Sequence, residues 1–595
     1  MRTKPLTLAG LALVSLILVA VSCQPQPLLG PSARLMGSYD VVVVGGEPEG
    51  VAAAVASARN GRSTMLLVAE TELGGLFTQA MLNFLDLNIT PSGELANTGI
   101  FAEFFLAIGK KNAFDVSRAK QAFQQLVLGE SKLRVRYDRR LLASVGSGQR
   151  LVGVQVSSPD GIEEYHGQVL IDATADADLA AMSGVATTFL REDLGQPGVG
   201  MGSTLMLHIK QVDWPALRAE AASGRLGYAS STDVVAWGFG RIASLYRPHD
   251  PDTFLRGLNI GRQDDGSVLI NALVIFGVDP LNTESYQQGL AKGRAEAPFV
   301  LDWLRQNLGG FAQAELVAFP EALYVRESRH MIGLYRLTVN DVLENSIFPD
   351  AIAFGCYPLD IQAASPDDLG FVVGKPKLYS IPIRCLIPQN LTNLLVVGRS
   401  ASYDSLAAGS ARVVPLGMSV AEAAGVGAAV MLQAGITAQE LAQPKFYGQV
   451  QERLRAQGVR WPSGGFPSSY PDHPATPALK YLVKLGLISG GYGNSWQLTQ
   501  TADEHLAARL MAAGMQRMRK DAKPAAVAVY SAGQVNIPLT RDRLQQLAVL
   551  ALERLPLKNW QPWLVTALGE SSGATLSRGE LYQFVAKFLE WVKTK

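Results

Sequence analysis

The most constraining feature of the sequence is a segment of about 30 residues near its start that predicts a βαβ unit. Residues 39–44 form a mostly apolar run that ends in two glycines, as expected of a strand buried on both faces. Residues 50–60 are rich in alanine, and such small side chains let a helix pack closely on a sheet. Residues 64–68 form a second apolar run. This order predicts a right-handed crossover between two parallel strands.

The turn between the first strand and the helix resembles a dinucleotide-binding turn in part. Such turns carry glycines at the first, third and sixth positions, which form the turn, admit the pyrophosphate and seat the helix. Gly45 and Gly50 match the first and sixth positions, and Gly46 supplies part of the clearance that Glu47 removes from the third. The flanking strand and helix favour cofactor binding by these three glycines over a purely structural junction.

An acidic residue is expected about 20 residues after the turn, where it would bind ribose hydroxyls. Glu70 occupies this place, just past the second predicted strand, and Glu72 is a nearby competitor. Either carboxylate could instead be an exposed loop residue. Gly74 and Gly75 follow, and their bare backbone could approach a cofactor.

Residues 39–75 resemble the FAD-dependent oxidoreductases of the glutathione reductase-like superfamily, including relatives labelled xanthan lyase-like. Residues 169–178 are similar to the second flavin motif of the family, with Ala175 in place of its usual glycine. Residues 393–399 and 409–415 are similar to the C-terminal flavin-contact segment. The resemblance implies non-covalently bound FAD, with contacts from Asp172, Thr174, Gly398, Arg399 and Gly409.

Four side chains are candidates for chemistry beside the flavin: His330, Arg329, Tyr403 and Arg412. His330 could transfer a proton, although a lone histidine is more often structural. Four arginines could anchor an anionic substrate or the cofactor phosphates, or could instead form ordinary ion pairs: Arg326, Arg329, Arg384 and Arg412. Tyr403 lies in a loop where many relatives carry a histidine that this sequence lacks.

The first 22 residues predict a secretory signal peptide, because a short basic region precedes the apolar stretch 6–21. The residues before Cys23 resemble a bacterial lipobox, which implies a lipid anchor at Cys23 and a tether over 23–38. Simple cleavage, leaving a soluble protein, is the alternative. We therefore expect an exported, membrane-anchored lipoprotein of the bacterial cell envelope.

Composition excludes some classes of function. The chain has 53 Lys+Arg against 52 Asp+Glu, so it lacks the basic excess typical of nucleic-acid binding. Six histidines without clustered Cys/His pairs predict no metal site. Cys356 and Cys385 are the only cysteines after Cys23; packing is their default role, although export permits a disulfide.

The chain is too long for one hydrophobic core, and we expect an α/β fold of several domains. A Rossmann-type FAD-binding domain is predicted over 39–185 and 346–440, with an inserted α+β substrate domain over 186–345. Residues 465–595 predict a helical C-terminal domain that resembles degenerate S-layer homology repeats, which bind cell-wall polymers. A plain helical dimerisation or packing domain is equally open.

The resemblance implies an FAD-dependent oxidoreductase that takes a hydride from an unidentified extracytoplasmic small molecule. Two alternatives remain. The fold could be a catalytically silent scaffold of an envelope binding or assembly protein, since Glu47 and Ala175 depart from the family pattern. It could also belong to a polysaccharide lyase-like protein, although no group of residues indicates a lyase site.

Overall fold

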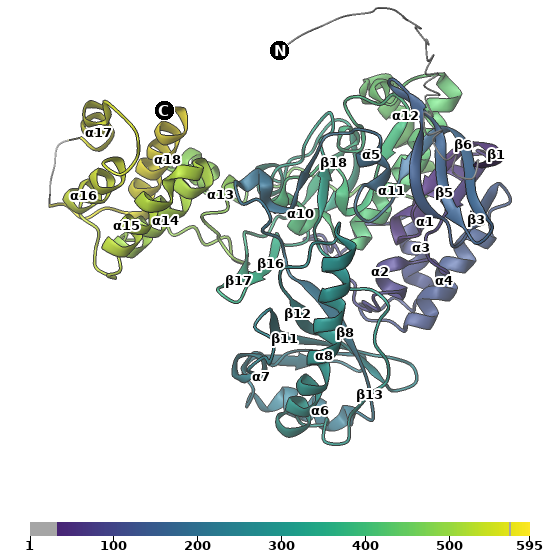
Figure 1. Cartoon of the computed structure of the whole chain (residues 1–595), viewed down its shortest axis with the longest axis horizontal. Coiled ribbons are helices and arrows are strands. Elements are labelled where there is room, and N and C mark those ends of the chain that lie inside the picture. The colour runs from purple at the N-terminus through teal and green to yellow at the C-terminus, as the bar shows by residue number, and fades with distance from the viewer. Residues whose placement is uncertain (1–32, 570–572) are drawn as a thin grey trace, which may run out of the picture.

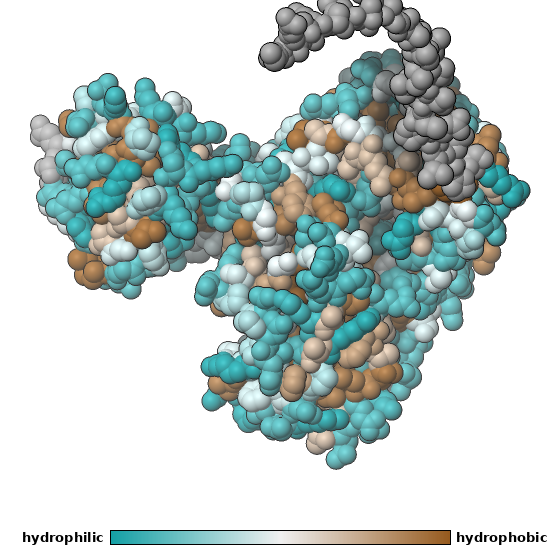
Figure 2. Space-filling view, in the orientation of Figure 1, coloured by the Kyte–Doolittle hydropathy of each residue, from teal (hydrophilic) through white to brown (hydrophobic). Residues whose placement is uncertain are grey.

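The computed structural model describes residues 33–569 and 573–595. Figure 1 shows three parts: a sheet with helices, a second sheet domain beside it, and a helical C-terminal region set apart from both. The surface in the same view is mostly hydrophilic with scattered hydrophobic residues (Figure 2). The predicted signal peptide and Cys23 lie outside the described residues, so export and lipidation stay predictions.

The first sheet has seven strands and confirms the predicted parallel βαβ unit. Its path in space runs β3 (Leu133–Arg136), β2 (Thr64–Leu67), β1 (Arg34–Val44), β6 (Gly161–Asp172), β5 (Arg150–Ser158) and β4 (Arg140–Ser147). Strand β1 is parallel to both β2 and β6. It begins before the predicted residue 39, because residues of the expected tether pair with β6 from Arg34 onward.

A strand from much later in the chain completes this sheet. Strand β6 pairs with β5 in antiparallel fashion along its first half, and its last residues pair in parallel with β19 (Leu394–Val396). Leu170 and Leu394 are partners in this register. The carboxyl ends of β1, β6 and β19 therefore meet at one edge of the sheet, as the three flavin-like motifs predict.

Two helices of small residues pack closely against each other beside the sheet. Helix α1 (Pro48–Arg59) contacts α11 (Val414–Ala434) so closely that a Cβ at Gly425 would lie 2.3 Å from the Ala53 carbonyl oxygen. Helix α11 is apolar and long enough to cross a membrane, but its residues from Val414 to Met431 are buried inside the protein. Its composition reflects a core position.

The second sheet has six strands, all antiparallel, and its own hydrophobic core. In spatial order these are β13 (Glu315–Leu316), β8 (Ser203–Lys210), β12 (Val268–Ile275), β11 (Thr253–Arg262), β10 (Val235–Gly238) and β9 (Ala229–Ser231). Helix α8 (Thr283–Asn307) contributes Ala297, Val300 and Leu304 to this core. The domain lies below the first sheet in Figure 1 and corresponds to the expected insertion.

The C-terminal region is helical, as predicted. Its helices are α13 (Thr476–Lys484), α14 (Glu504–Met518), α15 (Lys523–Ala532), α16 (Arg541–Leu552), α17 (Trp560–Leu568) and α18 (Arg578–Thr594). Thr540 and Ser577 cap the N-termini of α16 and α18 with their side chains. Both helix starts lie within residues 465–595, the region that resembles S-layer homology repeats; cell-wall binding stays a prediction.

Candidate active site

A cavity opens at the carboxyl edge of the first sheet, where ligands bind in open α/β folds. Its walls come from segments far apart in the chain. They include Glu47, Glu49, Leu76, Phe77, Leu82, Phe84, Asp86, residues 173–175, residues 324–326, Gly398, Arg399 and residues 412–415. The first sheet, the α11 N-terminus and a segment that pairs with the second sheet thus meet here.

The glycines of the first turn are required by packing. A Cβ at Gly45 would lie 2.3 Å from the Ala173 carbonyl oxygen, and one at Gly50 would lie 2.0 Å from the Gly45 carbonyl oxygen. A Cβ at Gly46 would lie 2.4 Å from a methyl group of Val68. Gly45 also has a φ of +117°, which favours glycine. The three glycines let β1, β2 and β6 close together, whereas the side chains that reach the cavity from this turn are carboxylates.

Glu47 ties two loops of the cavity wall together. Its Oε2 accepts a hydrogen bond of 2.9 Å from the Leu76 backbone, and its carboxyl group fills the space over Gly75. The Gly74 backbone donates to the Gly46 carbonyl oxygen, at 2.8 Å. Burial raises the pKa of Glu47 to about 6. Gly74 and Gly75 therefore shape the wall, while Leu76 and Phe77 line it.

Glu49 is a second carboxyl group at this end of the cavity, and sequence reasoning missed it. It lies between Gly398 and the first turns of α11, where a Cβ at Gly417 would be 2.3 Å from its Oε1. Burial, reinforced by the charge of Glu47, raises the pKa of Glu49 to about 8. At neutral pH Glu49 is thus mostly protonated and able to donate a hydrogen bond.

Arg399 supplies the positive charge at this end. Its guanidinium pairs with Asp176, at 2.7 Å, and donates to the Val325 carbonyl oxygen, also at 2.7 Å. Its Nε is buried and has no partner within the described part of the chain. Asp176 and the two glutamates outnumber this one arginine, so we call this region the acidic end, defined by Glu47, Glu49, Asp176 and Arg399.

A second region of the cavity, which we call the arginine end, is formed by Asp86, Tyr324, Arg326 and Arg412. Arg412 donates to the Tyr324 hydroxyl, at 2.8 Å, and the Arg326 guanidinium lies 4.1 Å from the centre of the same ring. Arg326 also donates to the Gly202 carbonyl oxygen, which links this end to the second sheet domain. Burial lowers the pKa of Arg326 to about 10, and nearby Arg256 and Arg412 act in the same direction.

A model of the FAD dependent oxidoreductase family matches residues 40–454, which is most of the chain. The protein belongs to this family. No curated protein matches the chain significantly. The match to the family model identifies FAD as the cofactor and the protein as a flavoprotein of the oxidoreductase class.

Solved structures of flavoproteins resemble this FAD dependent oxidoreductase at low identity. A geranylgeranyl bacteriochlorophyll reductase-like protein of Thermoplasma acidophilum is 12% identical, over 90% of this chain and 99% of its own, with a TM-score of 0.38. The p-nitrophenol 4-monooxygenase of Pseudomonas putida is 11% identical, over 87% and 97%, with a TM-score of 0.34. Such similarity says nothing about substrate.

The acidic end fits the FAD of this oxidoreductase family. Helices α1 and α11 both begin at the cavity wall, and neither has a side-chain cap. Uncapped helix N-termini are anion sites, because their first backbone N–H groups lack partners. The unpartnered Nε of Arg399 adds a further donor. These groups would hold the pyrophosphate, provided that Glu47 and Glu49 are protonated or turn aside.

The remaining predicted cofactor residues of this oxidoreductase have different positions. Thr174 and Gly398 line the cavity, but Asp172 is turned inward, where it accepts bonds from Thr174 and the Ala180 backbone. Glu70 is exposed beyond β2, close enough for its charge to raise the pKa of Glu47. Gly409 packs in α10 (Ser405–Ala411), where a Cβ would lie 2.7 Å from Ile361, and does not line the cavity.

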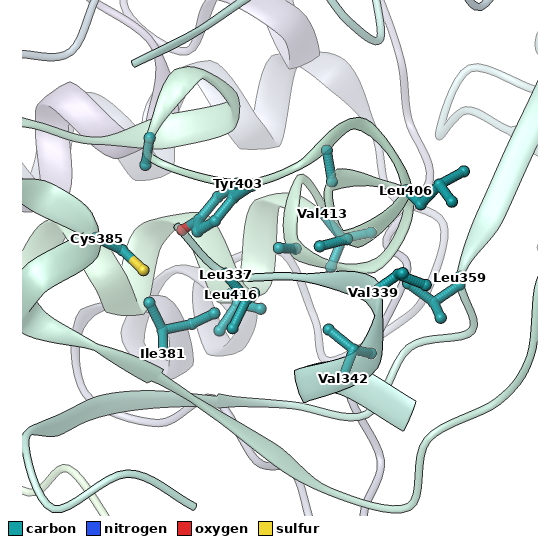
Figure 3. Packing of buried hydrophobic residues seen from close by; sticks show 14 of the residues in the cluster. Leu337, Val339, Val342, Leu359, Ile381, Cys385, Tyr403, Leu406, Val413 and Leu416 are labelled. Atoms are coloured by element: carbon teal, nitrogen blue, oxygen red, sulfur yellow. The ribbon is translucent and has the colours of Figure 1, made fainter. Parts of the chain in front are cut away.

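Of the four predicted catalytic residues, only Arg412 lines the cavity. His330 is buried on β14 (Arg329–Met331), where its Nε2 lies 3.5 Å from a Glu327 carboxylate oxygen. Arg329 pairs with Asp178, at 2.9 Å. Tyr403 is packed in the hydrophobic core beside Cys385 and Leu416 (Figure 3).

Several cavity residues had no sequence signal that could have identified them. Asp86 and Tyr324 lie in irregular segments, and only the tertiary fold brings them to Arg412. Burial raises the pKa of Asp86. Cys356 and Cys385 are both buried and unpaired, so neither forms a disulfide in the described structure.

Proposed function

We propose that this FAD-dependent oxidoreductase takes a hydride from a small molecule outside the cytoplasm. When bound, FAD supplies the redox chemistry by accepting the hydride, and a separate electron acceptor reoxidises it. The chain itself would bind the cofactor phosphates at the acidic end, orient the donor molecule at the arginine end and keep water out with its apolar walls.

The observation that supports this proposal is the division of one cavity into two chemically different regions. The charges that most affect Glu47 and Glu49 are those of Glu70, Asp176 and Arg399. Arg326 and Arg412 are most affected by a separate group, made of the charges of Asp86, Arg256 and Asp360 and the hydroxyl groups of Tyr324 and Tyr357. One region therefore suits the cofactor, and the other leaves room for a second molecule.

The test is an anaerobic titration of the purified flavoprotein with small organic molecules, followed by flavin absorbance and mass spectrometry. The proposal predicts that a donor bleaches the flavin and leaves as a product two hydrogens poorer. Rapid bleaching by NADH or NADPH with no other substrate present would contradict it, because the nicotinamide would then be the hydride donor. Unsaturated sugar products without flavin reduction would instead indicate a lyase.

We also propose that the protein is exported and held at the membrane by a lipid on Cys23, with the C-terminal helices available for a cell-wall polymer. Both follow from the sequence resemblances. Replacing Cys23→Ser should move the protein from the membrane fraction to the soluble exported fraction. Unchanged membrane association of the Cys23→Ser protein would contradict the lipid anchor. Co-sedimentation with purified cell wall, with and without residues 465–595, tests the second part.

A further inference from the structure

The arginine end contains buried positive charge without ion-pair partners. Arg326 is 2% exposed and Arg412 is 9% exposed. Among the described residues, neither guanidinium group has a carboxylate oxygen within 4.0 Å, so neither forms an ion pair. Charged side chains are rarely buried unless they are paired, because removing them from water is costly. Such an arrangement calls for an anion from outside the chain.

Arg412 has a free donor at the cavity. Its Nη1 donates to the Tyr324 hydroxyl, and its Nη2 lies 3.5 Å from the Asp360 carbonyl oxygen. Its Nε is buried and has no hydrogen-bond partner anywhere in the described ranges. Arg412 lines the cavity, so its guanidinium group borders the space that a ligand there would occupy.

The charges around this region leave an excess of one. Arg256, Arg326 and Arg412 influence one another together with Asp86 and Asp360. Three guanidinium groups thus lie near two carboxyl groups. A monoanion would balance this excess. A phosphate dianion would add a second negative charge next to Asp86 and Asp360.

Part of the cavity lining is apolar. Phe77, Leu82, Phe84 and Val325 line the cavity together with the two arginines. A ligand that fits both features has an apolar body and one small planar anionic group. Guanidinium groups bind carboxylates with matching planar geometry, often through two hydrogen bonds.

We propose that the substrate is a carboxylic acid whose carboxylate binds Arg412 and Arg326 and whose apolar part contacts Phe77 and Phe84. This inference rests on the proposed function, because it assigns the arginine end to the hydride donor. It makes Arg412 and Arg326 specificity-determining residues that hold the substrate by charge.

The experiment uses acetate and benzoate as probes, with acetamide and benzamide as uncharged controls, in calorimetric titrations of the FAD-loaded protein. We expect the carboxylates to bind and the amides to bind at least about 10-fold more weakly. Arg412→Met and Arg326→Met should weaken carboxylate binding about 10- to 100-fold while leaving the bound FAD per chain unchanged. Arg412→Lys keeps the positive charge and should weaken carboxylate binding less than Arg412→Met.

Arg218→Met serves as the matched control, because Arg218 forms an exposed ion pair with Asp233 far from the cavity lining. Equal binding of acids and amides would overturn the inference. So would arginine variants that lose FAD but bind benzoate normally, because the arginines would then serve the cofactor. A flavin-free protein that still binds benzoate through Arg412 would sink the proposed function and leave the carboxylate site standing.

Discussion

The two ends of the cavity are built to attract negative charge in opposite ways. The acidic end carries Glu47, Glu49 and Asp176 against the single Arg399, and relies on uncapped helix N-termini for anion binding. The arginine end carries fixed guanidinium charge that the chain leaves unpaired. The acidic end therefore depends on the protonation of Glu47 and Glu49, whereas the guanidinium groups of the arginine end keep their charge over the neutral range.

This difference separates cofactor from substrate on physical grounds. A pyrophosphate next to Glu47 and Glu49 is favoured when those groups hold protons. With a pKa of about 8, Glu49 is mostly protonated at neutral pH, whereas Glu47, with a pKa of about 6, takes up its proton only at mildly acidic pH or when the phosphates bind. Binding of a substrate carboxylate at the arginine end does not require Glu47 or Glu49 to be protonated. Variants that weaken binding at one end and leave binding at the other unchanged would support this separation. Variants that weaken binding at both ends would contradict it.

The largest effect is expected from Gly50→Val, which should destroy the acidic end. The added side chain would clash with the Gly45 carbonyl oxygen, a backbone atom that cannot move without separating β1 from β6. We expect destabilisation of about 3 kcal/mol or more and complete loss of FAD, measured by thermal unfolding and absorbance. Gly448→Ala, where a Cβ meets open space in a helix, should instead be neutral or stabilising. A stable, yellow Gly50→Val protein would refute this packing account.

A smaller loss is expected from Arg399→Met, which removes the positive charge from the acidic end. Asp176 would lose its ion-pair partner. The cofactor phosphates would then face three carboxyl groups with no positive charge to compensate them. We expect FAD affinity to fall by about 2–3 kcal/mol, measured by fluorescence titration of the apoprotein. Benzoate binding should be unaffected. Weakened binding of both ligands would mean that the two ends are not independent.

A pH titration should distinguish the two ends without any substitution. The phosphates of FAD favour the protonated forms of Glu47 and Glu49, so FAD affinity is highest below about pH 6. It should fall as the pH rises through about 6 and further through about 8, by up to about 10-fold per pH unit for each proton lost. Glu49→Gln should remove the upper part of this dependence. Constant FAD affinity from pH 5 to 9 would contradict the assignment.

The smallest effect is expected from Tyr403→Phe. Its ring is buried in the core of Figure 3 and does not line the cavity. We expect a change in stability below about 1 kcal/mol and unchanged FAD content, benzoate binding and turnover. A large loss of turnover with intact FAD binding would show that Tyr403 reaches the reacting atoms after all.

Local sequence patterns predicted β1 and β2 of the first sheet, because each is an apolar run beside an alanine-rich helix. Recognisable motifs assigned β6 and β19 to the same domain, whereas their pairing is visible only in the structure. The cavity side chains were harder to predict. Arg412 lies in a motif, but Asp86 and Tyr324 reach it only through the packing of irregular segments. Local patterns also cannot distinguish Arg412, at the cavity, from Tyr403, which the same segment buries in the core.

Glu47 shows why a departure from a motif can mislead. At the third position of the turn it looked like an obstacle to pyrophosphate. In the structure its carboxyl group holds the Leu76 backbone and fills the space above Gly75, so the loop and the turn depend on it. That contact joins residues 29 positions apart and depends on the tertiary fold.

The central claim is that this cavity binds FAD, and the visible absorption spectrum of the purified mature protein tests it most directly. The account predicts a flavin spectrum, with the chromophore released on denaturation and identified as FAD in the supernatant. A colourless protein that cannot be reconstituted with FAD at pH 5, where Glu47 and Glu49 are mostly protonated, would contradict it.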